Sequence, residues 1–434
     1  MRKVMRITAV MMAVCMIFLS GCIFDKTKID KVYASGNLTE NVTGIVTDPD
    51  YKPGEEYNEA MADLFIKMFQ ENIVLEDNEG KNVMISPMSI AMALCMTANG
   101  ATDETREEFT KLFGMNPEEL SKAFKGCVDN YTNVGQIFEK APDTAINFAN
   151  SVWFRKGEIE VKQKFLEQCV GYFGAEVFEG AFDDITVNDI NGWVQRNTNQ
   201  MIDKIIEQLM PDEVMVLINA IAFEGKWEEP YEEYQVKDDE FTMEDGTVQK
   251  IKMLCSEEGN YIKGDNEVGV IKPYAGNKFS FVALLPDEGI VLNEYINSLS
   301  GEEFVRLIEN RSFEDVITRI PKFKYEYNHS QMDVLKNLGV SRALDPSAQF
   351  GDMGETNTGY LYIGDVLHKT FIELDENGTK AAAVTAVIMK NEGAAIDEAP
   401  PKRVILDRPF VFAIIDNSNS LPIFIGTVEN ISEN

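Results

Sequence analysis

The sequence has few of the residues on which metal-dependent and nucleophilic catalysis depend. It contains only two histidines, His329 and His368, in 434 residues. Catalytic triads and most zinc sites use histidine in a recognisable pattern, and neither of these histidines lies in one. The nucleophile motif GxSxG and the zinc-protease motif HExxH are both absent. We therefore expect neither an enzyme nor a protein that needs a metal or an organic cofactor.

Cysteine is also too scattered to form a recognisable site. None of the six cysteines belongs to a CxxC pair, so the spacing favours neither zinc binding nor redox exchange. Cys95 lies in the apolar run 90–96 and is expected to be a small buried hydrophobe. The sequence leaves open whether Cys95, Cys127, Cys169 and Cys255 form disulfides.

Positive charge is in short supply. Lysine and arginine number 40 against 72 aspartates and glutamates, which gives a formal net charge of −32. Such a surface repels nucleic acid, and its charge argues against cation-dependent binding of anionic lipids or polysaccharides. The acidity is most simply that of a soluble, self-repelling surface, and we expect a monomer that does not bind nucleic acid.

The N-terminus has the pattern of an export signal. Arg2, Lys3 and Arg6 precede the apolar run 7–19, which is too short to span a bilayer as a stable helix. Leu-Ser-Gly-Cys at 19–22 then resembles the bacterial lipobox, in which the chain is cleaved before the cysteine and lipid is attached to its thiol. We expect residues 1–21 to be removed and Cys22 to anchor the protein to the outer face of a bacterial membrane. An ordinary secretory signal with a chance cysteine is the alternative.

Beyond the signal, composition divides the chain into a polar stretch and one large domain. Residues 22–56 are polar, poor in aromatics and without helical periodicity, so they are predicted to be a flexible tether. No Pro-, Gly- or Ser-rich linker interrupts residues 57–434, which are predicted to form a single domain.

The order of the periodic segments predicts an α+β fold. Helical patterns come first, at 57–70, after Ser86-Pro87, after Thr102, at 162–173 and at 190–206. The run 214–223 is almost entirely apolar, as in a strand that is covered on both faces. Short alternating runs then dominate to the C-terminus, and they favour large antiparallel or mixed sheets.

The stretch 374–387 can be read in two ways. It opens with the turn residues Asp-Glu-Asn-Gly and continues with small and β-branched residues. In a strand, one face would carry Thr379, Ala381, Ala383 and Thr385, none of them large or charged. The residues that follow, 391–401, resemble an exposed loop instead. The segment could therefore pass from a loop into the middle of a sheet.

Residues 57–431 resemble the serpin family, because motifs of that family follow one another in the family's order. They are Asn82 with Ser86-Pro87-x-Ser89-Ile90, Asn191-x-Trp193-Val194 with Thr198, Leu217-Ile-Asn219-Ala-Ile-Ala-Phe-Glu-Gly-Lys-Trp227, Ile271-Lys-Pro-Tyr274, Leu284-Leu-Pro286, Ile320-Pro-Lys-Phe323, Leu335-x-x-Leu-Gly339, His368-Lys369, Glu376-Asn-Gly-Thr379 and Asp407-Arg-Pro-Phe410. The resemblance implies three β-sheets, eight or nine helices and an exposed reactive loop.

The resemblance also implies a function and assigns residues to it. A serpin of the inhibitory kind traps a serine protease, and sometimes a cysteine protease, as an acyl-enzyme while its cleaved loop inserts as a new strand. The hinge of that loop corresponds here to residues 376–383, with Glu376, Gly378, Thr379, Ala381, Ala382 and Ala383 as its key positions. The resemblance implies a polar sheet-opening cluster made of Ser86, Ser89, Asn219 and His368. It places Trp227 and Lys322 where the loop first enters the sheet. A non-inhibitory serpin that acts as a carrier is the second hypothesis.

The bond that a target protease would cut is placed by counting from the hinge. In the family the cut usually follows the seventeenth residue from the hinge glutamate, which gives the bond Glu392-Gly393 here. The bonds after Lys390, Ala394 or Ala395 are alternatives. These residues point to a Glu-preferring or elastase-like protease, or to a trypsin-like one if Lys390 is used.

Overall fold

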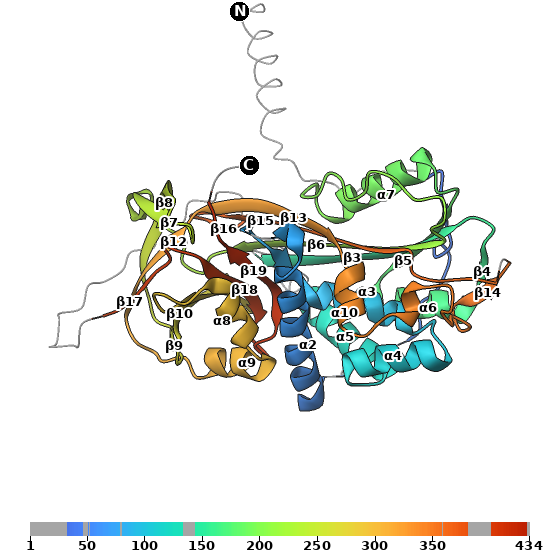
Figure 1. Cartoon of the computed structure of the whole chain (residues 1–434), viewed down its shortest axis with the longest axis horizontal. Coiled ribbons are helices and arrows are strands. Elements are labelled where there is room, and N and C mark those ends of the chain that lie inside the picture. The colour runs from blue at the N-terminus through green and yellow to red at the C-terminus, as the bar shows by residue number, and fades with distance from the viewer. Residues whose placement is uncertain are drawn as a thin grey trace, which may run out of the picture. The chain divides into compact units, whose positions relative to one another are not determined.

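The computed structural model describes residues 33–46, 51, 53–78, 80–132, 144–357, 359–380 and 401–431 (Figure 1). Ala34–Asn434 belong to one compact unit. The α-helices of the described residues are α2 (Glu55–Ile73), α3 (Pro87–Ala98), α4 (Asp103–Phe113), α5 (Pro117–Thr132), α6 (Gln163–Phe173), α7 (Asp184–Asn197), α8 (Leu292–Ser298), α9 (Gly301–Glu309) and α10 (Met332–Asn337). The 3-10 helices are η1 (Glu76–Asn78), η3 (Glu233–Gln235) and η4 (Arg342–Leu344).

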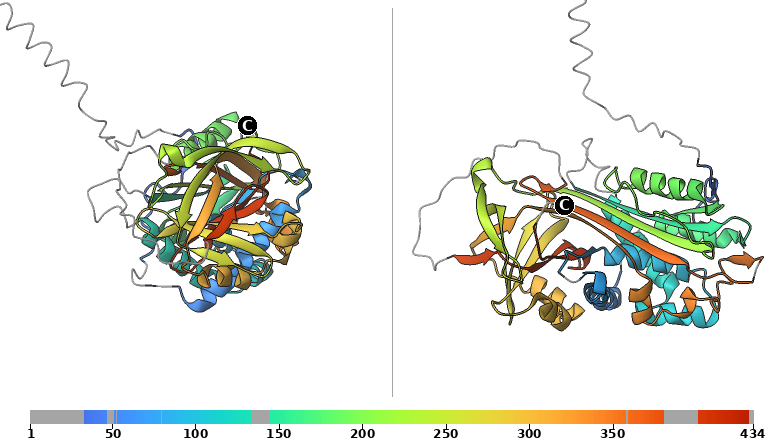
Figure 2. Two further views of the ribbon diagram at one scale, coloured as in Figure 1. Left: turned by 90° about the vertical axis from the view of Figure 1, so that its left-hand side faces the viewer. Right: turned by 45° about the horizontal axis from the view of Figure 1, so that its top comes forward.

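A seven-stranded mixed sheet is the largest element of the fold, and its strand order is β1-β5-β3-β6-β16-β15-β13. The strands are β1 (Gly36–Asn37), β5 (Glu176–Gly180), β3 (Thr144–Arg155), β6 (Met215–Lys226), β16 (Gly378–Thr379), β15 (Asp365–Leu374) and β13 (Phe323–Ser330). Helix α7 covers one face and α3 and α5 lie against the other, so β6 is buried on both sides (Figures 1 and 2).

Three further sheets complete the fold of the described residues. A six-stranded sheet has the order β2-β19-β18-β11-β10-β9, with β2 (Met84–Ile85), β19 (Pro422–Val428), β18 (Phe410–Asp416), β11 (Phe279–Pro286), β10 (Glu267–Pro273) and β9 (Tyr261–Lys263). A four-stranded sheet has the order β17-β12-β8-β7, with β17 (Lys402–Ile405), β12 (Val316–Pro321), β8 (Val248–Glu258) and β7 (Val236–Thr242). A small two-stranded sheet pairs β14 (Gly354–Thr356) with β4 (Ile159–Val161). The α+β class predicted from the sequence is confirmed, and the two-stranded sheet adds to the three that the resemblance implies.

The helix predicted after Ser86-Pro87 is confirmed as α3, and the structure shows why it begins there. Ser86 is the N-cap, and its hydroxyl accepts a hydrogen bond from the Ser89 amide. Pro87 occupies the first turn, where its missing N–H costs nothing. Every residue of α3 is buried, so the helix fixes Ser86 and Ser89 beneath the large sheet.

The helix predicted at 190–206 is wrong in both of its bounds. Helix α7 begins six residues earlier, because the Asp183 carboxylate caps it by accepting from the amides of Ile185 and Thr186. It ends at Asn197, and Asn199 and Gln200 then take positive φ values of 51° and 62°. The apolar residues that follow continue the helical period in the sequence, but in the structure they belong to an irregular segment.

Part of the stretch predicted to be a tether lies against the domain. Strand β1 pairs with β5 and forms the edge of the large sheet, and the Ile45 amide donates to the Glu167 carbonyl on α6. Gly44 and Gly171 approach so closely that a Cβ on either residue would lie 2.6 Å from backbone atoms of the opposite segment. This contact needs pairing between distant residues, which composition alone does not reveal.

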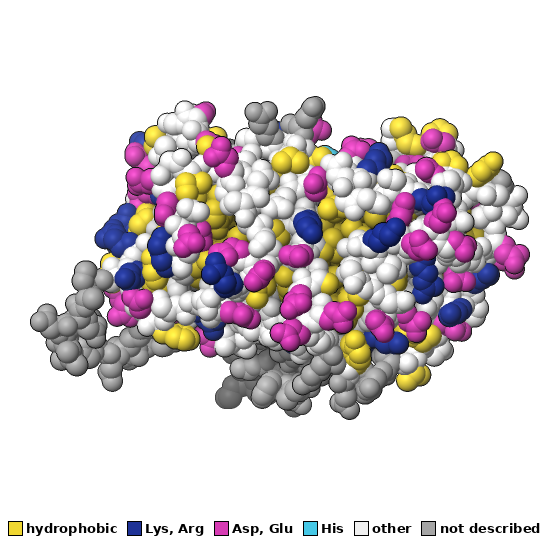
Figure 3. All heavy atoms as spheres, turned by 60° about the horizontal axis from the view of Figure 1, so that its bottom comes forward, with side chains coloured by type: hydrophobic (Ala, Val, Ile, Leu, Met, Phe, Trp, Pro, Cys, Tyr) yellow, Lys and Arg dark blue, Asp and Glu magenta, His cyan; other side chains and the backbone are white. Residues whose placement is uncertain are grey.

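The surface carries the charge expected from composition. Figure 3 shows one face of the molecule, on which acidic side chains are scattered with basic ones between them. None of the helices in the described parts of the chain is long and apolar enough to cross a membrane.

Candidate functional site

The two-residue strand β16 occupies the space between β6 and β15 at one end of the large sheet. Gly378 and Thr379 pair antiparallel with Lys226 and Gly225 on β6, and Thr379 pairs with Leu374 on β15. Further along, β6 and β15 pair with each other directly and in parallel, Val216–Ala220 against Asp365–Lys369. The hinge therefore begins inside the sheet, at the end where β16 separates the two parallel strands β6 and β15.

A turn leads the chain from β15 back into β16. The Asp375 carboxylate accepts hydrogen bonds from the amides of Asn377 and Gly378, at 2.7 and 3.3 Å. A Cβ on Gly378 would lie 2.0 Å from the Gly225 carbonyl oxygen, and the φ of Gly378 is 154°. Only glycine allows the chain to approach β6 this closely.

Two aromatic residues after β6 hold this turn by its carbonyl groups. The Trp227 amide donates to the Asn377 carbonyl and the Trp227 indole Nε1 donates to the Asp375 carbonyl, both at 2.9 Å. The Tyr231 amide donates to the Glu376 carbonyl, also at 2.9 Å. Three successive carbonyl groups are thus satisfied by one short segment.

The side chain of Thr379 points into the protein. It is 2% exposed, and its hydroxyl lies 2.6 Å from the Tyr274 hydroxyl. The Tyr274 ring stacks on Trp227 with centroids 4.6 Å apart, and its burial raises the pKa of its phenol. Thr379 thus occupies a small polar niche among large rings, which has no room or partner for a charged side chain.

Charged side chains of the hinge lie on the outer side. The Lys322 ammonium is 2.5 Å from the Glu376 carboxylate, and both side chains are about one-third exposed. Burial acts to raise the pKa of Glu376, but the hydrogen bond from Lys322, a backbone hydrogen bond and the charge of Lys322 together outweigh it, and the pKa is lowered. Lys380 leaves the sheet with a φ of 39°, and its ammonium lies over the Phe371 ring.

The four residues of the sheet-opening cluster meet where β6 and β15 pair directly. His368 Nδ1 lies 2.6 Å from Asn219 Oδ1, and His368 Nε2 accepts from the Ser86 amide at 3.0 Å. The Asn219 amide nitrogen donates to both the carbonyl and the hydroxyl oxygen of Ser89. All four residues have no exposed surface.

These contacts fix the protonation state of His368. Because Nε2 accepts from a backbone N–H, the proton of the neutral ring must be on Nδ1, which then donates to Asn219. Burial lowers the pKa of His368 from 6.5 to about 3, since no carboxylate compensates the charged form. The imidazole therefore acts as a neutral bridge between α3 and β6.

Sequence reasoning missed several residues of the site. Asn150 on β3 is 2% exposed and accepts from the Asn219 amide at 2.6 Å, while its own Nδ2 has no hydrogen-bond partner. Tyr231 and Tyr274 contact the hinge, although only Tyr274 lies in a motif that the sequence had singled out. The one available signal for Asn150 was its place as a polar residue in the largely apolar run 145–154.

Other predicted residues fall outside the described part of the chain. They are Ala381, Ala382, Ala383, Lys390, Glu392, Gly393, Ala394, Ala395 and Cys22. Within the described residues, no group of three or more His, Cys, Asp or Glu side chains could hold a metal ion. Cys95, Cys127, Cys169 and Cys255 are unpaired there.

Comparisons with known proteins agree on one family. Residues 59–431 match the family model described as "Serpin (serine protease inhibitor)". The chain is 28% identical to an uncharacterized serpin-like protein of Thermococcus kodakarensis, over 98% of this chain and 99% of that protein. Human neuroserpin is 27% identical, with 85% of this chain and 90% of neuroserpin covered. The native-state crystal structure of the thermophilic serpin tengpin has a TM-score of 0.84 and 41% identity, covering 93% of this chain and all of tengpin.

We predict that acid destabilises the protein through His368. The unfolded chain takes up a proton below pH 6.5, whereas folded His368 stays neutral down to about pH 3. Its contribution to stability is complete above pH 6.5 and is lost as the pH falls, by about 1.4 kcal/mol per pH unit. Glu429, whose pKa is raised by burial to about 7, acts with the opposite sign, so the informative quantity is a difference between variants.

Urea unfolding at pH 7 and pH 5 measures that difference. The loss of unfolding free energy should be about 2 kcal/mol larger in the wild type than in His368→Gln. The variant His329→Gln, which changes the half-buried histidine, should behave as the wild type. Equal losses in wild type and His368→Gln would contradict the assigned role of the ring.

Proposed function

The chain belongs to the serpin family, and from that premise we propose that it is a suicide inhibitor that uses its hinge as an insertable strand. The family consists in general of protease inhibitors and not of enzymes. In the proposed mechanism, a serine protease, or by the same chemistry a cysteine protease, attacks the reactive loop, here residues 384–401, and forms an acyl-enzyme. The loop then enters the large sheet between β6 and β15 and carries the protease with it.

The position of β16 is the observation that carries this proposal. Its pairings with Gly225 on β6 and Leu374 on β15 are those of a strand that has begun to insert. If the same register continues, Thr385 comes to lie opposite both Asn219 and His368. Insertion would then separate the Asn219–His368 pair and replace one parallel ladder with two antiparallel ones, which are slightly more stable per residue.

The residues that would enter the protein interior are suited to it. In the continued register, Ala381, Ala383 and Thr385 share the inward face with Thr379, and no proline interrupts residues 378–399. Small neutral side chains add no uncompensated charge to a buried layer. A non-inhibitory carrier remains the second hypothesis from the family, but no feature of this hinge favours it.

The lengths of β6 and β15 support a cut near Glu392. The first residues of β15 and β6, Asp365 and Met215, would come opposite residues 388 and 389. A cut after Glu392 therefore leaves enough chain to pair along the whole length of β6 and β15 and to link to the protease. We propose Glu392-Gly393 as the reactive bond, with a Glu-preferring or elastase-like protease as the target.

We also propose that the protein is exported and held by lipid at Cys22 on the outer face of a bacterial membrane. The support is the sequence of charged residues, apolar core and Leu-Ser-Gly-Cys at the N-terminus. It acts as a monomer in this proposal, because large exposed apolar side chains of the described residues, such as Ile185, Tyr234 and Phe313, lie on different elements.

We predict that Thr379→Arg turns the inhibitor into a substrate. The arginine would enter the niche beside Tyr274 without a partner, at a cost of about 3–5 kcal/mol. Insertion would slow, and the protease would complete hydrolysis and escape. Denaturing gels should show cleaved chain in place of a covalent complex. Lys380→Arg, with the same new side chain on the outward face, should keep trapping, and undiminished trapping by Thr379→Arg would refute the hinge assignment.

The reactive bond can be read from the fragment that cleavage releases. Mass spectrometry of the C-terminal peptide from a denatured complex should find Gly393 as its first residue. A first residue between Asn391 and Ile396 would still agree with the lengths of β6 and β15. A peptide that begins outside this window would overturn the length argument.

Membrane attachment should depend on Cys22. The variant Cys22→Ala should move from the membrane fraction to the soluble fraction, since acyl chains supply the anchoring energy. Cys95→Ala, which removes a buried cysteine, should leave fractionation unchanged. Retention of Cys22→Ala in the membrane would argue against lipidation.

A further inference from the structure

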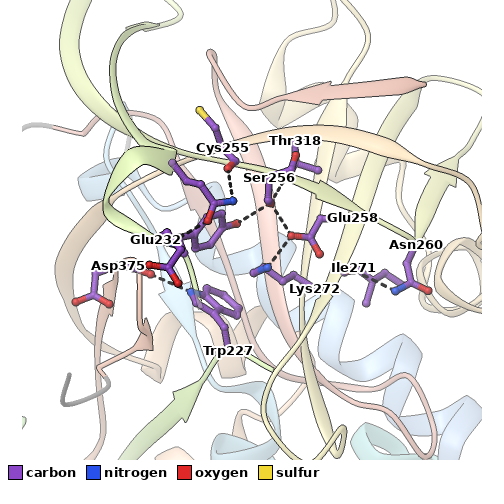
Figure 4. Close-up of polar contacts among 12 residues, drawn as sticks. Trp227, Glu232, Cys255, Ser256, Glu258, Asn260, Ile271, Lys272, Thr318 and Asp375 are labelled. Carbon is purple, nitrogen blue, oxygen red and sulfur yellow. Dashed lines mark hydrogen bonds and ion pairs between the residues drawn. The ribbon is translucent and has the colours of Figure 1, made fainter. Parts of the chain in front are cut away.

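A buried ammonium group lies behind the two aromatic residues that hold the hinge turn. Among the described residues, Lys272 is the one lysine or arginine that is buried, with an exposed fraction of 3%. Its Nζ lies 4.5 Å from the centroid of the Tyr231 ring and 5.6 Å from that of Trp227. Figure 4 shows Lys272 between Trp227 and Glu258, on the side of the indole away from Asp375.

The ammonium is fixed by a carboxylate that is itself fixed. Glu258 Oε1 lies 2.6 Å from Lys272 Nζ and accepts from the Ser256 hydroxyl at 2.6 Å. The Ser256 hydroxyl lies 2.9 Å from that of Thr318, on the neighbouring strand β12. These contacts tie the charge to the four-stranded sheet, as Figure 4 shows.

A buried ion pair of this kind contributes little net stability but holds its surroundings in one geometry. Removing two charges from water costs about as much as their attraction returns, so an apolar pair of similar volume would stabilise the fold equally well. A cation against the faces of two rings, in contrast, favours one position of each ring. Here the same two residues donate three hydrogen bonds to the carbonyls of residues 375–377.

We propose that Lys272 and Glu258 are positioning residues for the hinge. The ammonium holds Trp227 and Tyr231 in place, and these residues hold the turn from which β16 enters the sheet. The pair thereby sets how firmly the first inserted residues, Gly378 and Thr379, are retained before cleavage. The role of Lys272 and Glu258 in positioning the turn does not depend on protease inhibition. Only the consequence of this positioning for inhibition rests on the proposed function.

Hydrogen exchange in the full chain tests the proposal. In Lys272→Met the amides of Trp227 and Tyr231, which donate to the hinge turn, should exchange about tenfold faster. Lys272→Met/Glu258→Gln leaves no unpaired buried charge, so its thermal stability should return toward that of the wild type. The backbone amides of residues 226–233 should nevertheless still exchange fast in this double variant, because the ammonium is still missing. Lys252→Met on β8, which removes an exposed lysine paired with Asp238, is the matched control and should exchange as the wild type.

Two results would overturn the proposal. One is wild-type exchange at 226–233 in the double variant, which would show that only charge balance mattered. The other is an equal acceleration in β11 (Phe279–Pro286), which would indicate general loosening of the fold. Because the readout is backbone exchange, it is independent of protease trapping, and a failure of the inhibitor proposal would leave this test valid.

Discussion

The direct pairing of β6 with β15 is the contact on which the rest of the structure depends. These strands are parallel neighbours over only five residues each, Val216–Ala220 and Asp365–Lys369. The neutral ring of His368 reinforces that short ladder by linking Asn219 to the amide of Ser86, the N-cap of α3. At the other end of the same two strands, β16 already occupies the space between them. The buried cluster therefore holds β6 and β15 together at one end of the pair, and the hinge separates them at the other end.

The hinge and the buried cluster compete for the space between β6 and β15, because the register of β16, if continued, leads toward the cluster. Every two residues by which β16 extended would add hydrogen bonds to both β6 and β15 and bring the chain closer to the cluster. Extension to the cluster would then require the Asn219–His368 contact to separate. The native arrangement persists because the turn at 375–378 is held by Trp227 and Tyr231 while the cluster holds the strands together. In this account, loop cleavage releases a strand that the sheet is already shaped to accept.

The sequence predicted those parts of the site that depend on local pattern. The apolar run at 214–223 indicated β6, and Ser86-Pro87 indicated the start of α3. The insertable strand expected at 379–385 lies mostly outside the described residues and stays a prediction. Other features depend on contacts between distant residues. Lys272 in Ile271-Lys-Pro-Tyr274 is compatible with an ordinary exposed strand position, and only the fold brings Glu258 to it. The bounds of α7 and the docking of residues 36–45 likewise depend on caps and pairings that periodicity does not contain.

The central claim is that the uncleaved protein withholds a strand which its sheet can accept. The most direct measurement is the melting temperature before and after a single cut within residues 387–395 by a protease that is not trapped. We predict that the cut raises the melting temperature by about 10 °C or more, because the released strand completes the sheet. An unchanged or lower melting temperature after a clean cut would contradict the account.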